Sequence, residues 1–513
     1  MTKNNLLKKL RKLHKWPGIV ITLFVVLFSL SGILMNHRDL ISSVDIGRNV
    51  LPKNFRYNNW NNGAVKSICL LGSDSALVYG NIGTWLTTDH FQTFQDWNAG
   101  FPSGIDNRKI SKIVKTPAGK LFAGTYFGLY QFDFQKKSWQ KIGLPISEER
   151  VTDLILKGNE LMVQTRSFLM KSIDGSEFMP VILPAPEGYD GKVSLFKTIW
   201  LLHSGEIWGT FGKLAVDLFG LALLIISATS LLHFIFPNWL KRRKKKQRET
   251  TVLGAARNTN LRWHNRLGWI FIPFLIFVTV SGMFLRPPLM IPIVNSTVSP
   301  IPGTILSSQN PWYDKLRRVL YDDERHLFLF STADGMFVTD ENFRNPMQRV
   351  AGEPPVSIMG CNVLEKKSGG TYLVGSFNGL FLWDPFTGQL TDYISGLPYQ
   401  PSTQIGPPVS DNMIDGWFTD QQGNEFYFDY NLGVLPIRHT EKFGEMSREI
   451  IVESPISLWN FALEVHTGRI FEPVLGPFFI LYIPLAGLCC LIVLISGFFI
   501  WWIGYRKKKK TNG

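Results

Sequence analysis

Histidines occur at matched positions in two parts of this chain, and their spacing is the feature best suited to chemistry. His14 is followed by a glycine after four residues and by Ser-Gly after seventeen, and His264 is followed in the same way. A second match pairs the His203-Ser-Gly segment with the His466-Thr-Gly segment. The chain is therefore duplicated. A duplicated chain that repeats histidines at the ends of apolar segments predicts paired metal ligands.

Four segments are long and apolar enough to cross a membrane. Residues 16–35, 267–285 and 473–505 contain no charged residue, and residues 214–236 contain one, Asp217. Each is long enough for a hydrocarbon core of about 30 Å at a rise of about 1.5 Å per residue. We predict an α-helical membrane bundle of four transmembrane helices, with the lipid bilayer as its surroundings.

The net charge of +14 is distributed unevenly along the chain. Three clusters beside the apolar segments, at residues 3–15, 241–248 and 506–510, hold eighteen basic residues, and the remainder of the chain has 36 basic and 40 acidic residues. This is the positive-inside pattern, which places both termini and the 241–260 loop in the cytoplasm. The distribution argues against a nucleic-acid partner.

The two segments outside the membrane, 41–196 and 291–456, are rich in β-strand patterns. Each contains three units of strand, glycine-bearing turn and strand, spaced by roughly 40–45 residues. The units cover residues 76–89, 120–133, 160–172, 326–339, 371–383 and 425–436. This period is typical of propeller blades, and the units resemble the propeller repeats of bacterial two-component sensor ectodomains.

We expect an all-β extracytoplasmic domain, a six-bladed β-propeller built from the two halves, because closure removes exposed sheet edges. Two separate small β-domains, or two half-propellers packed on other material, are the alternatives. The first half of the chain is predicted to contain a basic start with the first transmembrane helix (1–40), an outer half-domain (41–196) and the second transmembrane helix (197–240). A basic loop (241–260) leads to the second half. That half is predicted to contain the third transmembrane helix (261–290), an outer half-domain (291–456), the fourth transmembrane helix (457–505) and a basic tail (506–513).

Paired histidines in a membrane indicate haem, because neutral imidazole is a common axial ligand of haem iron. A pseudo-twofold axis along the membrane normal brings equivalent residues face to face. This axis pairs His14 with His264 on the cytoplasmic side and His203 with His466 on the outer side. No Cys-x-x-Cys-His motif occurs, so covalent, c-type haem attachment is excluded, and each pair would bind one haem without a covalent link.

Glycines accompany these four histidines. Gly18 and Gly268 lie one turn beyond their histidines, and Gly205 and Gly468 lie two residues beyond theirs. A flat macrocycle that lies against a helix needs missing side chains, and these glycines are the expected places.

Two further histidines break the symmetry. The counterpart of His37 is Pro287, and His233 corresponds to an apolar residue. Both are candidate cofactor-binding residues, relays to a substrate or quinone, or interfacial side chains. A continuous helix would separate His203 from His233 by about 45 Å, which is far for electron transfer between haems at those two levels. If His37 replaced one of the symmetric ligands, the outer haem would lie closer to the membrane.

Asp217 lies near the outer end of the second apolar segment. Lys213 precedes it by one turn, at a spacing that allows an ion pair. An ionisable group in this position is a functional candidate, in proton transfer or in binding a haem propionate, and a structural ion pair is the alternative.

The His-x-x-x-Gly…Ser-Gly helix followed by a His-Ser/Thr-Gly helix resembles the PepSY-associated transmembrane-helix family. The resemblance covers residues 12–40, 197–240, 261–290 and 457–505, and it places His14, His203, His264 and His466 on the family's recurring histidines. Members include membrane reductases of ferric siderophores with two b-type haems. The resemblance implies a bacterial inner (cytoplasmic) membrane protein with periplasmic domains. Blade-like repeats stand where family members often carry PepSY modules, which leaves the substrate open.

Transmembrane electron transfer is the leading functional hypothesis. Electrons would pass through two haems to an extracytoplasmic acceptor, with a ferric chelate as the expected substrate. No Gly-x-Gly-x-x-Gly follows a predicted strand, so the donor would be membrane quinol or a separate flavoprotein. The alternative is a non-enzymatic, membrane-anchored propeller that acts as a sensor, binding or accessory subunit. A transporter fits less well, because four helices carry so few polar groups.

Overall fold

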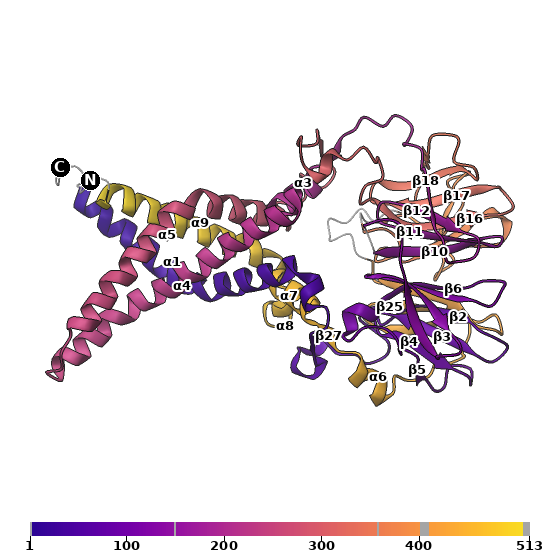
Figure 1. The fold of residues 1–513 in the computed structure, drawn as a ribbon, viewed down its shortest axis with the longest axis horizontal. Coiled ribbons are helices and arrows are strands. Elements are labelled where there is room, and N and C mark those ends of the chain that lie inside the picture. Colours follow the sequence, from indigo (N-terminus) through magenta and orange to yellow (C-terminus); the bar gives the residue numbers. More distant parts are fainter. Residues whose placement is uncertain (1–2, 148–149, 357–358, 401–409, 506–513) are drawn as a thin grey trace. The chain divides into compact units, whose positions relative to one another are not determined.

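The structure is a computed structural model that describes residues 3–147, 150–356, 359–400 and 410–505. It divides into two compact units, each built from both halves of the chain (Figure 1). The helical unit comprises Met1–Ile41, Gly191–Ser307 and Trp459–Gly513. The β unit comprises Ser42–Asp190 and Ser308–Leu458.

The helical unit contains a bundle of four long helices. They are α1 (Lys3–Asn36), α4 (Gly209–Lys245), α5 (Thr251–Phe284) and α9 (Tyr482–Tyr505). All four are long and apolar enough to cross a membrane, so the chain is a multi-pass membrane protein. Helix α1 packs against α4 and α9, and α5 packs against the same two helices. The duplicated helices α1 and α5 therefore lie diagonally opposite, as do α4 and α9.

Two of the predicted membrane helices are interrupted. Helix α3 (Leu195–Ser204) ends at Gly205, and η4 (Glu206–Trp208) leads from it into α4. Helix α7 (Leu458–His466) ends just before Gly468, and η7 (Arg469–Phe471), α8 (Glu472–Leu475) and η8 (Gly476–Leu481) lead into α9. Gly205 and Gly468 have φ angles of 77° and 76°, which glycine adopts without strain, so both breaks are encoded locally.

The segment predicted as a basic loop at 241–260 is mostly helical, because α4 continues to Lys245 and α5 begins at Thr251. The short helix α2 (Arg38–Ile41) follows α1, and β14 (Val193–Ser194) pairs with β15 (Thr297–Val298) in the same unit.

The β unit consists mainly of antiparallel sheets, and the described residues form six sheets of three or four strands. The first half of the chain contributes β2 (Val65–Leu70), β3 (Ala76–Gly80), β4 (Gly83–Thr87) and β5 (Gln95–Asp96); β6 (Ile110–Lys115), β7 (Leu121–Thr125), β8 (Gly128–Asp133) and β9 (Ser138–Ile142); and β10 (Val151–Lys157), β11 (Glu160–Thr165), β12 (Leu169–Ser172) and β13 (Met179–Val181).

The second half contributes β16 (Leu316–Asp322), β17 (Leu327–Thr332), β18 (Gly335–Asp340) and β19 (Gln348–Arg349); β20 (Val363–Lys366), β21 (Tyr372–Ser376), β22 (Gly379–Trp383) and β23 (Leu390–Asp392); and β24 (Ile414–Thr419), β25 (Glu425–Asp429) and β26 (Gly433–Ile437). Strand β1 (Asp45–Ile46) pairs with β27 (Ile456–Ser457), and α6 (Arg448–Glu453) precedes β27.

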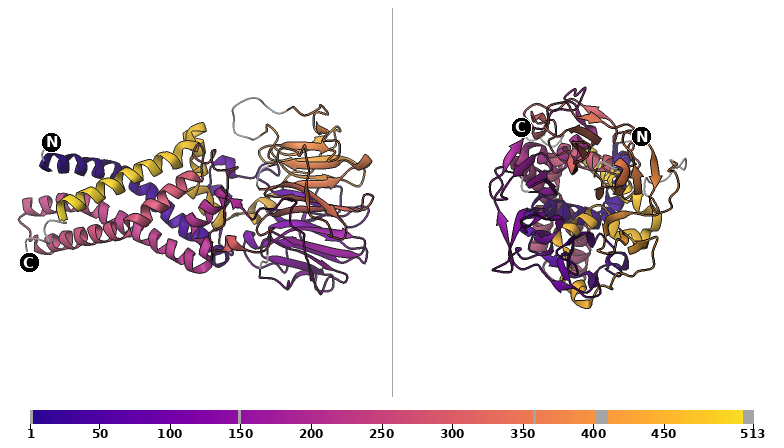
Figure 2. Two further views of the ribbon diagram at one scale, coloured as in Figure 1. Left: turned by 90° about the horizontal axis from the view of Figure 1, so that it is seen from above. Right: turned by 90° about the vertical axis from the view of Figure 1, so that its right-hand side faces the viewer.

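The sheets surround a common axis (Figure 2, right). The first strand of each sheet contacts that of the next, in the order β2, β6, β10, β16, β20 and β24, and β24 contacts β2. All six predicted strand pairs are antiparallel hairpins. The prediction of a propeller-like, all-β domain built from both halves is therefore confirmed.

Apolar side chains join the two halves of the β unit at two seams. At one seam Met162 and Leu169 share a buried cluster with Phe328 and Phe330. At the other, Trp60 and Trp85 pack with Phe418 and Phe428. Full burial of such a side chain contributes about 1.5–3 kcal/mol, so these seams stabilise the union of the halves.

Charged side chains from the first strands pair near the axis. Lys112 of β6 contacts Glu365 of β20 at 2.7 Å, which links two non-neighbouring sheets. Arg318 of β16 donates to Asp153 of β10 at 3.1 Å, across the boundary between the halves. The Arg318 and Asp153 side chains are only 12% and 4% exposed, so each charge depends on the other for compensation.

We expect Asp153→Asn to destabilise the β unit by about 3–5 kcal/mol, because it removes the carboxylate that pairs directly with the buried Arg318 guanidinium. Thermal unfolding of the full chain, followed by circular dichroism of the β signal, measures the loss. Lys136→Met is the control. It breaks an ion pair with Asp133 in which the lysine side chain is largely exposed, and exposed ion pairs contribute little to stability. Equal shifts for the two variants would contradict a structural role for the buried pair.

Candidate functional site

The first histidine pair, His14 and His264, comes from the diagonally opposite helices α1 and α5. Their ring centres lie 6.2 Å apart, and the ring planes make an angle of 74°. The duplication predicted that these two residues would meet, and the structure brings them together.

The second histidine pair, His203 and His466, comes from the last turns of the short helices α3 and α7. Their ring centres lie 6.1 Å apart at an interplanar angle of 57°. The breaks at Gly205 and Gly468 end α3 and α7 beside these residues, which places both imidazoles between the long helices. The second predicted pair is therefore also together in space.

Each of the four imidazoles makes the same contact with a neighbouring helix. Its Nδ1 lies within hydrogen-bond distance of a backbone carbonyl and of the hydroxyl three residues later. The acceptors are Val493 O (2.9 Å) and Ser496 Oγ (3.4 Å) for His14, Ile226 O (3.3 Å) and Thr229 Oγ1 (3.1 Å) for His264, Val278 O (3.1 Å) and Ser281 Oγ (3.1 Å) for His203, and Phe28 O (3.2 Å) and Ser31 Oγ (3.0 Å) for His466.

This contact fixes the tautomer of the imidazole. A carbonyl oxygen can only accept, so Nδ1 carries the proton and donates it. The hydroxyls donate their own protons to backbone carbonyls, as Ser31 does to Leu27 at 2.6 Å and Ser281 to Val278 at 3.1 Å. Nε2 is then the unprotonated nitrogen, and no hydrogen bond within the described residues engages it. This is the arrangement that orients a histidine for metal binding.

The residue after each serine is a glycine, and the imidazole occupies the space that its side chain would fill. A Cβ at Gly282 would lie 2.8 Å from His203 Cε1, and one at Gly497 would lie 2.9 Å from His14 Cε1. At Gly32 the corresponding distance to His466 Cε1 is 3.3 Å. His264 differs, because Ser230 follows Thr229 in its helix.

Some of the glycines that were expected to leave room for a macrocycle have a different role in the structure. Gly205 and Gly468 end short helices, so the prediction that they leave room for a macrocycle gives way to a backbone explanation. Gly18 lies against Val493 of α9, where a Cβ would make ordinary contact at 3.9 Å. Gly268 has open space within 4 Å of a Cβ position, and a macrocycle beside it stays a prediction.

The two pairs lie at different levels of the bundle. His14 and Ser31, which contacts the second pair, are seventeen residues apart in α1, and His264 and Ser281 have the same spacing in α5. At about 1.5 Å per residue this separation is about 25 Å along the helix axis. One continuous helix would place His203 and His233 about 45 Å apart. That distance does not apply, because His203 lies in α3 and His233 lies in the separate helix α4.

The ring spacing matches two imidazoles that share one metal ion. A metal–imidazole nitrogen bond is about 2 Å long, and the ring centre lies about 1 Å further, so opposed rings have centres about 6 Å apart. Among the described residues no group of three or more histidine, cysteine or carboxylate side chains could hold a metal ion. Each pair therefore offers two imidazoles and no further ligating side chain among the described residues.

The structure pairs Asp217 differently from the prediction. His37 Nε2 lies 2.7 Å from Asp217 Oδ2, and Asn36 Nδ2 donates to Asp217 Oδ1 at 2.9 Å. Lys213 instead lies 3.9 Å from Glu206. The Lys213–Asp217 ion pair was wrong, because the end of α1 reaches the carboxylate first. His37 makes no hydrogen bond or ring contact with either histidine pair.

His233 lies one turn beyond Thr229 on α4, on the side of the first pair. It is close enough to His14 and Arg257 for their charges to interact. Its Nδ1 is buried without a hydrogen-bond partner among the described residues.

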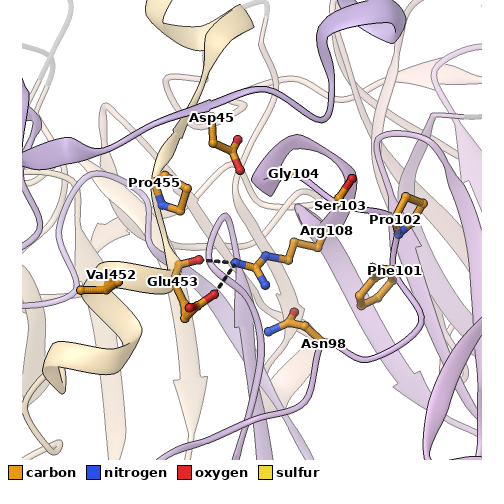
Figure 3. Close-up of a pocket in the computed structure, with 10 residues that line it drawn as sticks. All are labelled: Asp45, Asn98, Phe101, Pro102, Ser103, Gly104, Arg108, Val452, Glu453 and Pro455. Atoms are coloured by element: carbon orange, nitrogen blue, oxygen red, sulfur yellow. Dashed lines mark hydrogen bonds and ion pairs between the residues drawn. The ribbon is translucent and has the colours of Figure 1, made fainter.

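A polar cleft in the β unit is a separate candidate binding site (Figure 3). Asp45, Arg108 and Glu453 line it together with Asn98 and Phe101. Asp45 accepts the backbone N–H of Ile105 at 3.0 Å, and burial raises the pKa of its carboxyl group. Arg108 already donates to the Glu453 backbone carbonyl, so part of its hydrogen-bonding capacity is used within the protein.

Sequence reasoning missed the acceptors on α4 and α9, namely Thr229 and Ser496. The Ser496-Gly497 dipeptide repeats the Ser-Gly dipeptides that follow His14 and His264. Recognising that third copy would have identified the acceptor for His14. Thr229 has no following glycine, so only the position of α4 relative to α5 reveals it.

Comparison with known proteins places the chain in a family. A family model described as the PepSY-associated TM region matches residues 2–236 and 238–504. No curated protein sequence is significantly similar to the chain.

The solved structures found to be similar to this chain are remote from it in sequence. The extracellular domain of the putative hybrid two-component system BT4673 from B. thetaiotaomicron is 13% identical, with a TM-score of 0.37 over 74% of this chain and 33% of that chain. The corresponding domain of BT3049 from the same organism is 11% identical, with a TM-score of 0.34 over 74% and 40%. This chain thus spans about a third to two fifths of their length. YCF48 bound to D1 peptide is 7% identical, with a TM-score of 0.32 over 75% and 96%.

The family model covers both copies of the duplicated helices and includes all four paired histidines. The chain belongs to the PepSY-associated transmembrane region family.

Proposed function

We propose that this chain carries electrons across a membrane through two b-type haems, one bound by each histidine pair. The observation that carries the proposal is the repeated contact of four imidazoles, each with Nδ1 on a carbonyl and a hydroxyl, in two pairs with ring centres 6.2 and 6.1 Å apart. Iron porphyrin between each pair would supply one-electron chemistry.

The protein's own contribution is to fix the ligands and exclude water. The Nδ1 hydrogen bonds set the ring orientation and raise the basicity of Nε2 as a ligand. Leu275 on α5 is buried, and α9 contains no charged residue. A low-dielectric environment of this kind tunes the reduction potential of a bound iron centre.

We place the termini and the end of the bundle that holds the first pair in the cytoplasm, and the β unit on the extracytoplasmic side of a bacterial inner membrane. The basic clusters at residues 3–15 and 241–248 support this orientation, because basic residues concentrate on the cytoplasmic side. Electrons would then enter at the first pair and leave at the second.

The donor and acceptor are assigned by chemistry and by family resemblance. The donor is a membrane quinol or a separate flavoprotein, which loses one electron for each iron reduced. The acceptor is a ferric chelate, whose iron gains that electron and is released as Fe(II). Resemblance to ferric-siderophore reductases supports this acceptor. The cleft at Asp45 and Arg108 favours the second candidate function, a ligand-binding accessory protein without redox activity.

The first test uses haem content and reduced-minus-oxidised spectra of the purified full chain. We expect two b-type haems per chain. His14→Ala and His264→Ala should lose the same haem, and His203→Ala and His466→Ala the other, because each pair shares one iron. The control is His90→Asn, an exposed position in the β unit.

A colourless protein from haem-replete cells would contradict the redox function and favour the accessory role. Loss of different haems from the two partners of one pair would contradict the pairing alone.

The second test removes a hydroxyl that contacts Nδ1. We expect Ser281→Ala to weaken haem binding at the second pair by about 10–100-fold, because the hydrogen bond that orients His203 is lost in part. Thr279→Ala is the matched control: Thr279 makes the same kind of bond to a carbonyl of its own helix, at 2.7 Å, but contacts no histidine. Haem titration of the full chain measures both, and equal affinities for the two variants would argue against the orienting role of Ser281.

A further inference from the structure

A cluster of basic side chains lies beside the first histidine pair, and we name it the Arg257 cluster (Lys15, His233 and Arg257). Arg257 precedes His264 by seven residues on α5, and seven residues is close to two helical turns, so both lie on one face. His233 follows Thr229, the acceptor for His264, by one turn on α4. Lys15 is adjacent to His14. The three residues surround one end of the pair.

Two nitrogen atoms of this cluster are buried and make no hydrogen bond among the described residues. They are Nε of Arg257 and Nδ1 of His233. A buried donor without a partner costs about 1–3 kcal/mol, and more for a charged group. Water or a bound ligand can supply the partner of such a group.

The chain offers no counter-charge for the cluster. Residues 1–36, 218–313 and 473–513 contain a single acidic residue, Glu249. Glu249 lies in the exposed connection between α4 and α5, eight residues from Arg257. Within the described residues, no carboxylate pairs with Lys15, His233 or Arg257. Lys15 is exposed and its ammonium lies 5.0 Å from the Phe234 ring centre. The half-buried Arg257 is therefore the cation that an anionic ligand would compensate.

The cluster is distinct from the general excess of basic residues. Lys241–Lys245 at the end of α4 are exposed, and lipid headgroups and water account for them. Arg257 is half-buried and its Nε is fully buried, unlike these exposed residues at the end of α4. By the repeat spacing its counterpart in α1 is Leu7, and the counterpart of His233 in α9 is Ile500. The cluster is thus an addition to the duplicated histidine framework.

We propose that the Arg257 cluster binds carboxylate groups, specifically the propionates of the haem that the first pair holds. This inference rests on the proposed function. Arg257 would receive a carboxylate through its planar guanidinium, and His233 Nδ1 would donate to a second carboxylate oxygen. A lipid phosphate or carboxylate headgroup is the other source of the same anionic chemistry.

The test compares ferric protoporphyrin IX with its dimethyl ester, which lacks the carboxylate charges. The full chain from haem-limited cells is titrated with each, and binding is read from the band that His14→Ala loses. We expect Arg257→Gln to weaken protoporphyrin binding by about 10–100-fold, the range for hydrogen bonds to charged groups, and to leave ester binding unchanged. Arg257→Lys should restore part of the affinity, and Arg262→Gln, an exposed position on the same helix, should change neither.

Three results would overturn the proposal. Equal losses for the acid and the ester in Arg257→Gln would show a structural role. Unchanged binding of both, with loss of copurified phospholipid, would assign the cluster to a headgroup. A wild-type chain that binds neither porphyrin would overturn the proposed function as well, which distinguishes that failure from the other two.

Discussion

The hydrogen bond from each imidazole Nδ1 to a helix carbonyl is the interaction on which the rest of the bundle depends. One helical turn supplies both acceptors, since a carbonyl and the hydroxyl three residues later lie on the same face. In three of four cases the next residue is glycine, which gives the ring room to approach. The result is a compact acceptor site for imidazole that sets one tautomer and leaves Nε2 free. Helix geometry places both acceptors of each site on one face.

These acceptor sites also explain why the chain is duplicated. His14 and His203 of the first half contact α9 and α5 of the second, while His264 and His466 of the second half contact α4 and α1 of the first. Every imidazole is therefore fixed by the other half. Neither half could build a histidine pair by itself, and the same interdependence recurs in the β unit, where buried clusters and the Arg318–Asp153 pair cross between the halves.

Sequence reasoning located the elements and the meeting of the histidines, because both follow from periodicity and repeat spacing. The six β-hairpins and the partners of His14 and His203 are examples. It failed where the outcome depends on packing between helices. The spacing of Lys213 and Asp217 predicted an ion pair, but His37 and Asn36 reach Asp217 from α1. The sequence shows glycine at 205 and 468, but both were assigned to contact with a cofactor. Their role in ending helices depends on a positive φ, which the residue type alone does not reveal.

The central claim is that each histidine pair binds one iron through two imidazoles. Electron paramagnetic resonance and near-infrared magnetic circular dichroism of the oxidised full chain test it most directly, because both report the axial ligands of haem iron. The account predicts two low-spin ferric haems per chain, each with two histidine ligands. High-spin iron with one histidine ligand at either site, or a chain without haem iron, would contradict it.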